Sequence, residues 1–388
     1  MWWEAVYVCL DGSAQVRVIV KVLLITGSYP PLRCGVGDYS YNLATGLAKI
    51  ANVRIGVLTS LGAGRSEVKG GDKVEVFPVM AGWRLRELQK VIRIVKNWAP
   101  DIVHIQYPTQ GYGGGTLQWL LPIVAYMMGK KVVQTWHEDF ILSQVPHFIL
   151  KAVVPSKIVV VRSEYRKLLI PFYRWVIARR NLHFIRSAST IGKAVLDDQA
   201  RSALRARYAR GQERLVVYFG FVYPNKGVEF LFEVADPTSD QLVIAGEIAR
   251  ASEYGQQIQD RAAREPWRGK VTITGFLPPQ DVAALLAVAD AVVLPFRLGG
   301  GNWNTSIHAA VLQGTFVLTT SSTRHGYEET QNIYYTGIDA VQEMKIGLDR
   351  HAGKRRTYSP DIDRDEWQRI AHEHHSLYGD LLTSKLDS

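Results

Sequence analysis

Short apolar runs recur along the whole chain, and longer amphipathic stretches separate them. Runs rich in β-branched residues that alternate with helical patterns predict strands of a parallel sheet, buried on both faces. In the first half the predicted strands are Val18–Ile25, Val53–Leu58, Ile102–Gln106, Lys131–Thr135 and Ile158–Val161. In the second half they are Leu215–Phe219, Gln241–Ala245, Val271–Thr274, Ala291–Pro295 and Phe316–Thr319. The pattern therefore predicts an α/β protein of doubly wound type.

The series of strands and helices starts twice, which predicts two Rossmann-like domains that face each other across a cleft. We expect the first domain at residues 1–190 and the second at 213–360, joined by an Arg- and Ala-rich connection at 191–212. A last helix is expected within 361–388, at Arg364–Leu382. The length of 388 residues agrees with two domains of ordinary size.

The net charge of +10 is unevenly distributed. Residues 1–190 hold 24 Lys and Arg against 11 Asp and Glu, whereas residues 191–388 hold 22 against 25. The excess positive charge thus lies in the first half. It indicates an anionic partner there: a membrane surface, a nucleic acid or a phosphorylated substrate.

Two basic stretches in this half are candidates for that contact. Residues 84–98 form an amphipathic basic pattern, either a helix packed on the domain or an interfacial membrane helix. Residues 168–180 mix three aromatic residues with arginines, which suits a lipid headgroup layer. An ordinary solvated face is the alternative for this second stretch. Stacking on nucleic acid is a further one, but no nucleic-acid-binding motif accompanies it, and we expect no nucleic-acid partner.

Cysteine content and hydropathy indicate where the protein works. Cys9 and Cys34 are the only cysteines, so neither a disulfide framework nor a cysteine metal cluster is expected. No apolar run reaches the roughly 18 residues of a membrane span, and the start lacks the basic region of a signal peptide. We expect a cytoplasmic protein, with peripheral attachment to the inner membrane face as an extension of that expectation.

Two glycine-rich segments are candidates for phosphate binding. Gly35 and Gly37 follow the first strand and precede a helix expected at Asn42–Lys49. Residues 294–320 read as a strand end, a glycine turn, a helix from about Ile307 to Gln313 and a second strand. A helix start presents unpaired N–H groups to an anion. A purely structural turn is the alternative for both segments, and the dinucleotide pattern Gly-x-Gly-x-x-Gly is absent.

Polar residues at the ends of other strands are the remaining candidates. Gln106 and Tyr107 end one strand, and His137 and Glu138 follow the next. The carboxyl ends of parallel strands usually carry the site, and His137 could donate a hydrogen bond or move a proton near neutral pH. His104, inside its apolar strand, is expected in the core. Lys226 lies in a loop after a strand of the second half and could reach a diphosphate.

These segments together resemble the retaining glycosyltransferases of the GT-B fold, family 4. The resemblance runs from about residue 18 to 382. The matching pieces are residues 29–37, 135–138, 219–227, 274–278 with 289–290, 294–317 and, in the last helix, 367–378. It implies that the first domain binds the acceptor, that the second binds a nucleotide-diphosphate sugar, and that the last helix packs back toward the first domain.

The resemblance also implies roles for individual residues. His137 falls at the transferred sugar. From their places at strand ends, Glu138 is our second catalytic candidate, and Gln106 and Tyr107 are our candidates for acceptor binding. The donor phosphates would be held by Gly35, by Lys226 and by the helix start at Asn304, Thr305 and Ser306. Gly37, Arg297, Gly301 and Asn302 are our own further candidates for donor binding. The leaving diphosphate would act as the base, so neither a metal nor another cofactor is required. The work of the protein is then charge stabilisation and positioning.

The chain departs from the family pattern at three positions. The usual pair of glutamates would fall at Gly301 and Ala309, and the arginine that accompanies the phosphate lysine would fall near Phe221. Arg297 is our candidate replacement for that charge. We expect a retaining glycosyltransferase acting on a glycoconjugate, lipid or polysaccharide acceptor. The alternatives are a non-catalytic nucleotide- or glycan-binding partner of an active transferase and a nucleotide-sugar epimerase.

Overall fold

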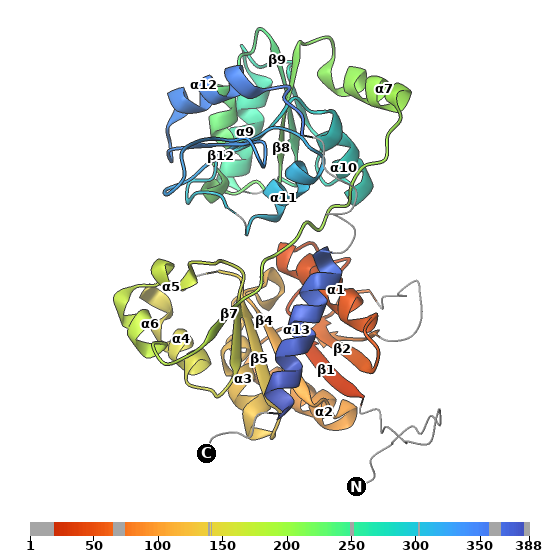
Figure 1. The fold of residues 1–388 in the computed structure, drawn as a ribbon, viewed down its shortest axis with the longest axis vertical. Helices are drawn as coiled ribbons and strands as arrows, with labels where there is room; N and C mark the ends of the chain where they lie inside the picture. Colours follow the sequence, from red (N-terminus) through yellow and green to blue (C-terminus); the bar gives the residue numbers. More distant parts are fainter. Residues whose placement is uncertain are drawn as a thin grey trace. The chain divides into compact units, whose positions relative to one another are not determined.

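The computed structural model describes residues 19–64, 74–138, 140, 142–248, 252–301, 303–356 and 366–383. The chain divides into two compact units. The first comprises Met1–Ser187 together with Asp365–Ser388, and the second comprises Ala188–Arg364. Each unit contains one seven-stranded sheet with helices packed on it (Figure 1). Two Rossmann-like α/β units were predicted, and this prediction is confirmed.

The first sheet has the strand order β3-β2-β1-β4-β5-β6-β7, and all its neighbouring strands are parallel. Its strands are β1 (Val20–Ile25), β2 (Val53–Ser60), β3 (Val74–Met80), β4 (Ile102–Tyr107), β5 (Lys131–Trp136), β6 (Lys157–Val160) and β7 (Leu182–Phe184). The helices of this unit are α1 (Gly35–Ala48), α2 (Leu88–Trp98), α3 (Leu117–Met127), α4 (Val145–Ala152), α5 (Tyr165–Leu168), α6 (Pro171–Val176) and α13 (Glu366–Thr383), with short 3-10 turns η1 (Leu85–Glu87), η2 (Gln110–Tyr112) and η3 (Leu142–Gln144).

The amphipathic pattern at residues 84–98 forms η1 and α2. Val91, Val95 and Trp98 of α2 are buried in one hydrophobic cluster with Leu23 and Val103 of the sheet. The apolar face of α2 is therefore occupied by the core of its own unit. Of the two alternatives for this stretch, the packed surface helix is the correct one. Among the described residues, no helix is both long and apolar enough to span a membrane.

The last helix, α13, belongs to the first unit, where it packs against α1. The two helices approach closely at Gly46, where an added Cβ would lie 3.0 Å from Ala371 Cβ and 3.1 Å from the Trp367 carbonyl oxygen. The Gln368 side chain also donates to the Gly46 carbonyl at 3.4 Å. The last helix thus returns to the first domain, as predicted, and it brings C-terminal side chains into contact with β4.

The second sheet has the order β10-β9-β8-β11-β12-β14-β13, parallel except for the antiparallel pair β13 and β14. Its strands are β8 (Arg214–Phe219), β9 (Asp240–Ala245), β10 (Val271–Ile273), β11 (Ala291–Leu294), β12 (Val317–Thr320), β13 (Gly326–Glu328) and β14 (Ile333–Thr336). The helices are α7 (Asp198–Ala209), α8 (Leu231–Val234), α9 (Glu253–Ala263), α10 (Pro279–Val288), α11 (Thr305–Leu312) and α12 (Val341–His351), with 3-10 turns η4 (Pro224–Lys226) and η5 (Val228–Phe230).

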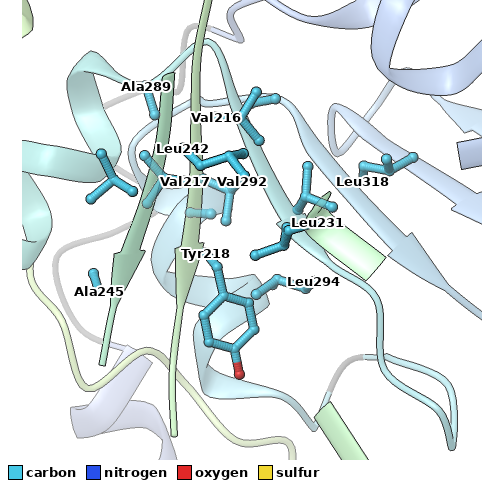
Figure 2. Packing of buried hydrophobic residues seen from close by; sticks show 14 of the residues in the cluster. Val216, Val217, Tyr218, Leu231, Leu242, Ala245, Ala289, Val292, Leu294 and Leu318 are labelled. Atoms are coloured by element: carbon cyan, nitrogen blue, oxygen red, sulfur yellow. The ribbon is translucent and has the colours of Figure 1, made fainter. Parts of the chain in front are cut away.

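The core of the second unit forms around the central strands of its sheet. Figure 2 shows Val216 and Val217 of β8 beside Leu242 of β9 and Val292 of β11, and all four are buried. Each of the ten predicted strands corresponds to an observed one. Strands β3, β7, β13 and β14 were not predicted. The expected connection, residues 191–212, contains α7, which packs on α10 of the second unit.

Candidate functional site

His137 lies directly after β5, at the carboxyl end of the first sheet. Its backbone N–H donates to the Tyr107 carbonyl oxygen at 2.8 Å, which continues the pairing of β5 with β4. The half-buried ring packs edge-on against Tyr39 of α1, with ring centroids 4.7 Å apart. Its Nε2 atom lies 2.9 Å from Oε1 of Gln106. Two of the predicted site residues, His137 and Gln106, are therefore in direct contact.

Gln106 is the middle of a buried chain of hydrogen bonds. Its amide nitrogen lies 3.1 Å from Nε2 of His104, and the Thr135 hydroxyl lies 2.7 Å from the same atom. Nδ1 of His104 lies 2.7 Å from the Tyr378 hydroxyl of α13. The chain thus runs from Tyr378 through His104 and Gln106 to His137. The expectation that His104 is a core residue is confirmed, since it is fully buried.

Donor and acceptor chemistry fixes the direction of this chain. The Gln106 amide nitrogen can only donate, so His104 Nε2 accepts, and the neutral His104 ring carries its proton on Nδ1. The Gln106 oxygen then faces His137 and can only accept. His137 must therefore hold its proton on Nε2. Its Nδ1 atom is left with a lone pair that can accept a hydrogen bond from a ligand.

The protonation of the three histidines follows from their burial. Burial, together with the smaller effect of nearby His374, lowers the pKa of His137 to about 3. Burial also lowers the pKa of His374 to about 4, against the opposing effect of its hydrogen bond to the Ile370 carbonyl. The pKa of His104 is held well below its usual range by burial and by its neighbours His374 and His137. At neutral pH the His137 ring is thus uncharged. Its Nδ1 atom can accept a hydrogen bond, and the ring has no second proton to transfer.

The other predicted residues of the first unit lie in different surroundings. The Glu138 side chain is exposed, and the backbone carbonyl oxygen of Glu138 accepts from the Tyr165 hydroxyl at 2.7 Å. Tyr107 is buried, with its ring stacked on Phe140 at 5.3 Å and the Lys151 ammonium 4.3 Å from its centroid. Gln106 is also fully buried. Gln106 is therefore placed to act through His137, and the contact of either residue with an acceptor stays a prediction.

Gly35 and Gly37 lie within the first turn of α1, and the expectation of a helix only from Asn42 was wrong. At Gly37 a Cβ would lie 3.0 Å from the Ser28 carbonyl oxygen, so the lack of a side chain allows the helix to pack there. Gly35 is exposed, with open space where a Cβ would be. The first N–H groups of a helix have no intrahelical partner. They leave α1 with a start that suits an anion.

In the second unit, Lys226 ends the turn η4 after β8. Its ammonium lies 5.0 Å from the centroid of the Phe296 ring, and the Asn225 carbonyl accepts from the Arg297 backbone N–H at 3.1 Å. Gly227 has φ of +65°, and a Cβ there would lie 2.2 Å from the Pro295 carbonyl oxygen. The loop that carries Lys226 is therefore packed against the loop that follows β11.

Helix α11 begins at Thr305, with Asn304 as the preceding cap residue. The Asn304 side-chain oxygen accepts from the Gly301 backbone N–H at 2.9 Å, which closes the glycine turn onto the helix start. Thr305 and Ser306 form the first turn and are half-buried. The predicted helix start is thus observed at these residues, while Asn302 lies outside the described residues.

Arg297 forms ion pairs with two carboxylates. Its Nε atom lies 3.0 Å from Glu229 Oε1 and its Nη1 atom 3.3 Å from Asp339 Oδ1, and the guanidinium lies 4.6 Å from the Phe230 ring. These pairs neutralise the cation that was expected to replace the missing arginine. A phosphate would therefore compete with Glu229 and Asp339 for the N–H groups of Arg297.

Comparison with known proteins gives both units the same assignment. The model described as Glycosyltransferase Family 4 matches residues 34–190, and the model described as Glycosyl transferases group 1 matches residues 213–344. Each unit therefore carries a glycosyltransferase-family domain. A curated relative, the alpha-D-kanosaminyltransferase of Streptomyces kanamyceticus, is 34% identical over 107 residues. That match covers 26% of this chain and 27% of the length of the relative.

Solved structures show the same fold over nearly the whole chain. The HepE protein of Anabaena, solved in complex with UDP and glucose, has a TM-score of 0.70 at 14% identity, over 93% of this chain and 100% of that chain. Sucrose-phosphate synthase of Thermosynechococcus elongatus has a TM-score of 0.67 at 14% identity, over 94% and 100% respectively. Together with the family matches, these likenesses support a GT-B glycosyltransferase.

In this glycosyltransferase domain, neighbouring atoms fill the space around Gly301 and Ala309, the two positions where the resemblance leads one to expect glutamates. A Cβ at Gly301 would lie 2.3 Å from the Trp303 ring, and Ala309 is fully buried. A glutamate at either position would need its neighbours to move. Trp303 therefore packs on the glycine turn before α11, and it was not among the predicted site residues.

His374 and Tyr378, which both contact His104, were also not predicted as part of the site. They are four residues apart, so both lie on the same face of α13, and this spacing was the available signal. Within the described ranges, no group of three or more His, Cys, Asp or Glu side chains is placed to hold a metal ion. Metal independence stays a prediction.

Proposed function

We propose that this chain transfers a sugar from a nucleotide-diphosphate sugar to an acceptor. The observation that carries the proposal is the packing of the Lys226 loop against the loop that leads to α11, inside a domain matched by a glycosyltransferase family model. A lysine and a helix start at one edge of a sheet offer charge and backbone N–H groups to a leaving diphosphate. The Anabaena relative in fold was solved with UDP and glucose, which supports a donor of this class.

In this proposal the chain works by binding and orientation. Lys226 and the first turn of α11, with Thr305 and Ser306, stabilise the charge that develops on the diphosphate. His137 accepts a hydrogen bond from a sugar hydroxyl through Nδ1, which its contact with Gln106 leaves free of a proton. The bond between the anomeric carbon and the diphosphate breaks, and the acceptor oxygen bonds to that carbon on the same face, so the anomeric configuration is retained. The departing diphosphate takes the acceptor proton. The acceptor is a hydroxyl group of a glycan, a lipid-linked sugar or another glycoconjugate.

A panel of nucleotide sugars tests the proposal. Thermal shift with each nucleotide diphosphate identifies the base that the second unit prefers, because a specific ligand raises stability by mass action. Transfer or slow hydrolysis of the matching sugar, with NMR of the product anomer, then tests both turnover and retention. Addition of EDTA tests metal independence. Inversion would overturn the retaining mechanism, and an epimerised donor would identify the alternative reaction.

A non-catalytic binding role is the second candidate. The packing of Trp303 against Gly301 and the burial of Ala309 favour it, because they remove the two carboxylates that the resemblance leads one to expect. A nucleotide that stabilises the chain, with no transfer or hydrolysis from any sugar of that nucleotide, would favour this candidate over the enzyme.

A further inference from the structure

One region of the first unit contains almost no acidic residues. Between residues 140 and 187 the sequence has one carboxylate, Glu164, and nine lysines and arginines. The single acid is paired locally, since the Lys167 ammonium lies 2.5 Å from its Oε1 atom. The region therefore carries a net positive field that its own side chains do not neutralise.

The short helices α5 and α6 present the exposed part of this region. Leu168, Phe172 and Trp175 expose 43%, 43% and 75% of their surfaces. The rings of Phe172 and Trp175 are stacked, with centroids 6.3 Å apart and planes 29° from parallel. The exposed cations around them are Lys167, Arg174 and Arg179. We call these six residues the α6 surface.

The other side of α6 fixes the helix to its unit. Tyr173 is fully buried and stacks on Phe148 of α4 at 4.1 Å. Arg166 donates to the Ile177 carbonyl oxygen at 3.1 Å, and Arg180 donates to the Val154 carbonyl. These two arginines hold the backbone of the segment. The apolar side chains of the α6 surface therefore face outward on an anchored helix.

We propose that the α6 surface docks the protein on an anionic lipid membrane. Tryptophan and phenylalanine rings lie favourably at the boundary between headgroups and acyl chains, and arginines beside them pair with lipid phosphates. An exposed apolar side chain gains free energy only if the partner offers an apolar phase, which a free phosphate ion does not. Helix α2, the other basic stretch, lacks this combination because its apolar face is buried.

This inference rests on the proposed transferase function in one respect, the purpose of docking. Docking would bring the first unit, which is expected to bind the acceptor, close to lipid-linked acceptors. Binding to vesicles needs no sugar and no turnover. Failure of docking and failure of transfer are therefore separate results.

Vesicle co-sedimentation with the full chain tests the proposal. We expect binding to vesicles of phosphatidylcholine with phosphatidylglycerol, little binding to phosphatidylcholine alone, and weaker binding at high salt. The double variant Phe172→Ser/Trp175→Ser should bind about tenfold more weakly or worse. The double reversal Arg174→Glu/Arg179→Glu should lose at least about tenfold. Thermal unfolding of each variant verifies that the fold is kept.

The matched controls lie in the same unit. Arg93→Glu/Lys96→Glu makes the same charge change on the exposed side of α2, and Met127→Ser removes an apolar side chain that is 79% exposed on α3. Both controls should change binding by less than about threefold. Brominated lipid should quench tryptophan fluorescence in the parent and less in Trp175→Phe, which keeps an aromatic ring.

Three outcomes would overturn the assignment. The parent could fail to bind anionic vesicles. The α2 reversal could weaken binding as much as the α6 reversal, which would mean diffuse attraction without a defined surface. A duplex oligonucleotide could bind in place of vesicles, with that binding lost in the α6 variants, which would make the partner a nucleic acid.

Discussion

Nε2 of His137 lies 2.9 Å from Oε1 of Gln106, and this contact decides which nitrogen of the histidine carries the proton. Gln106 is itself oriented by His104, and His104 by Tyr378 of the last helix. A buried amide therefore sets the hydrogen-bonding character of the candidate catalytic ring.

The variant Gln106→Leu should lower kcat for transfer by about tenfold to 100-fold. It removes the acceptor of the His137 Nε2 proton at nearly constant volume, and the loss of one buried hydrogen bond costs about 1–3 kcal/mol. Affinity for the nucleotide, measured by calorimetry, should stay unchanged because the donor loop lies in the other unit. Nitrogen-15 NMR should show that His137 no longer favours the Nε2–H tautomer.

Gln118→Leu is the matched control for that variant. Gln118 is also a buried glutamine of the first unit, where its side chain donates to the Gly115 carbonyl at 2.9 Å. It should lower stability by a similar amount and leave kcat within about threefold. Equal losses of kcat in the two variants would refute the role of Gln106 in orienting His137.

Stability should fall as the pH is lowered from 6.5 toward 4. The pKa values of His137 and His374 are lowered to about 3 and about 4, so over this window the unfolded chain binds protons that the folded chain does not. Asp38 acts in the opposite direction, since burial raises its pKa to about 6 and the folded state holds its proton more tightly. The buried histidines, His104 included, outnumber this one carboxyl.

Urea unfolding at pH 5, 6 and 7 measures this dependence. In His374→Gln the slope of unfolding free energy against pH should decrease by up to about 1.4 kcal/mol per pH unit, the contribution of one proton. A slope identical to that of the parent would show that His374 already binds its proton in the folded state.

Lys226→Ala should lower kcat/KM for the donor by about tenfold to 1000-fold, because it removes a charge that stabilises the leaving diphosphate. Affinity for the nucleotide diphosphate should fall as well. Arg268→Ala removes a cation from an exposed position of the same unit and should leave both quantities unchanged. Unaltered kinetics in Lys226→Ala would remove this lysine from the site.

Gly227→Ala should destabilise the second unit more than Gly211→Ala does. Both glycines have positive φ, +65° and +84°, which costs an alanine about 1 kcal/mol. At Gly211 a Cβ would meet open space, whereas at Gly227 it would lie 2.2 Å from the Pro295 carbonyl oxygen. The additional clash should bring the total at Gly227 to about 2–4 kcal/mol in urea unfolding. Similar losses of unfolding free energy at both sites would mean that the loop containing Pro295 moves to accommodate the added methyl group.

Ala309→Glu should not restore a family-like donor contact. Ala309 is fully buried in α11, so the new carboxylate would be buried without a designed partner at a cost of several kcal/mol. A fall in melting temperature, together with unchanged or weaker nucleotide binding, is the expected result. Tighter donor binding at unchanged stability would show that the helix can turn this position outward.

The central strands could be predicted because burial on both faces leaves a continuous apolar run. β1 and β4 read in this way, and so do β8 and β11. β3 could not be predicted in this way, because it is a half-buried edge strand that contains Pro78. β7 and β13 are only three residues long, too short to show a period. These strands form because a neighbouring strand is already in place.

The candidate site was only partly predictable for a similar reason. His137 and the start of α11 follow strand ends and could be placed from local sequence. The two glycines of α1 were expected in a loop, because glycine weakens isolated helices, but close packing of Gly37 on Ser28 favours the helix. The partner of His104 could not be predicted, because Tyr378 is 274 residues away in the chain.

That separation has a consequence for how the protein is made. The first unit needs α13 to cover α1 and to supply the hydroxyl group that His104 contacts, yet α13 leaves the ribosome after the whole second unit. The first sheet must therefore wait, with one face of its core uncovered, while about half of the chain is still being synthesised. Domains generally fold in the order of synthesis, but here the second unit can be complete before the first, because the first unit is finished only when α13 is added.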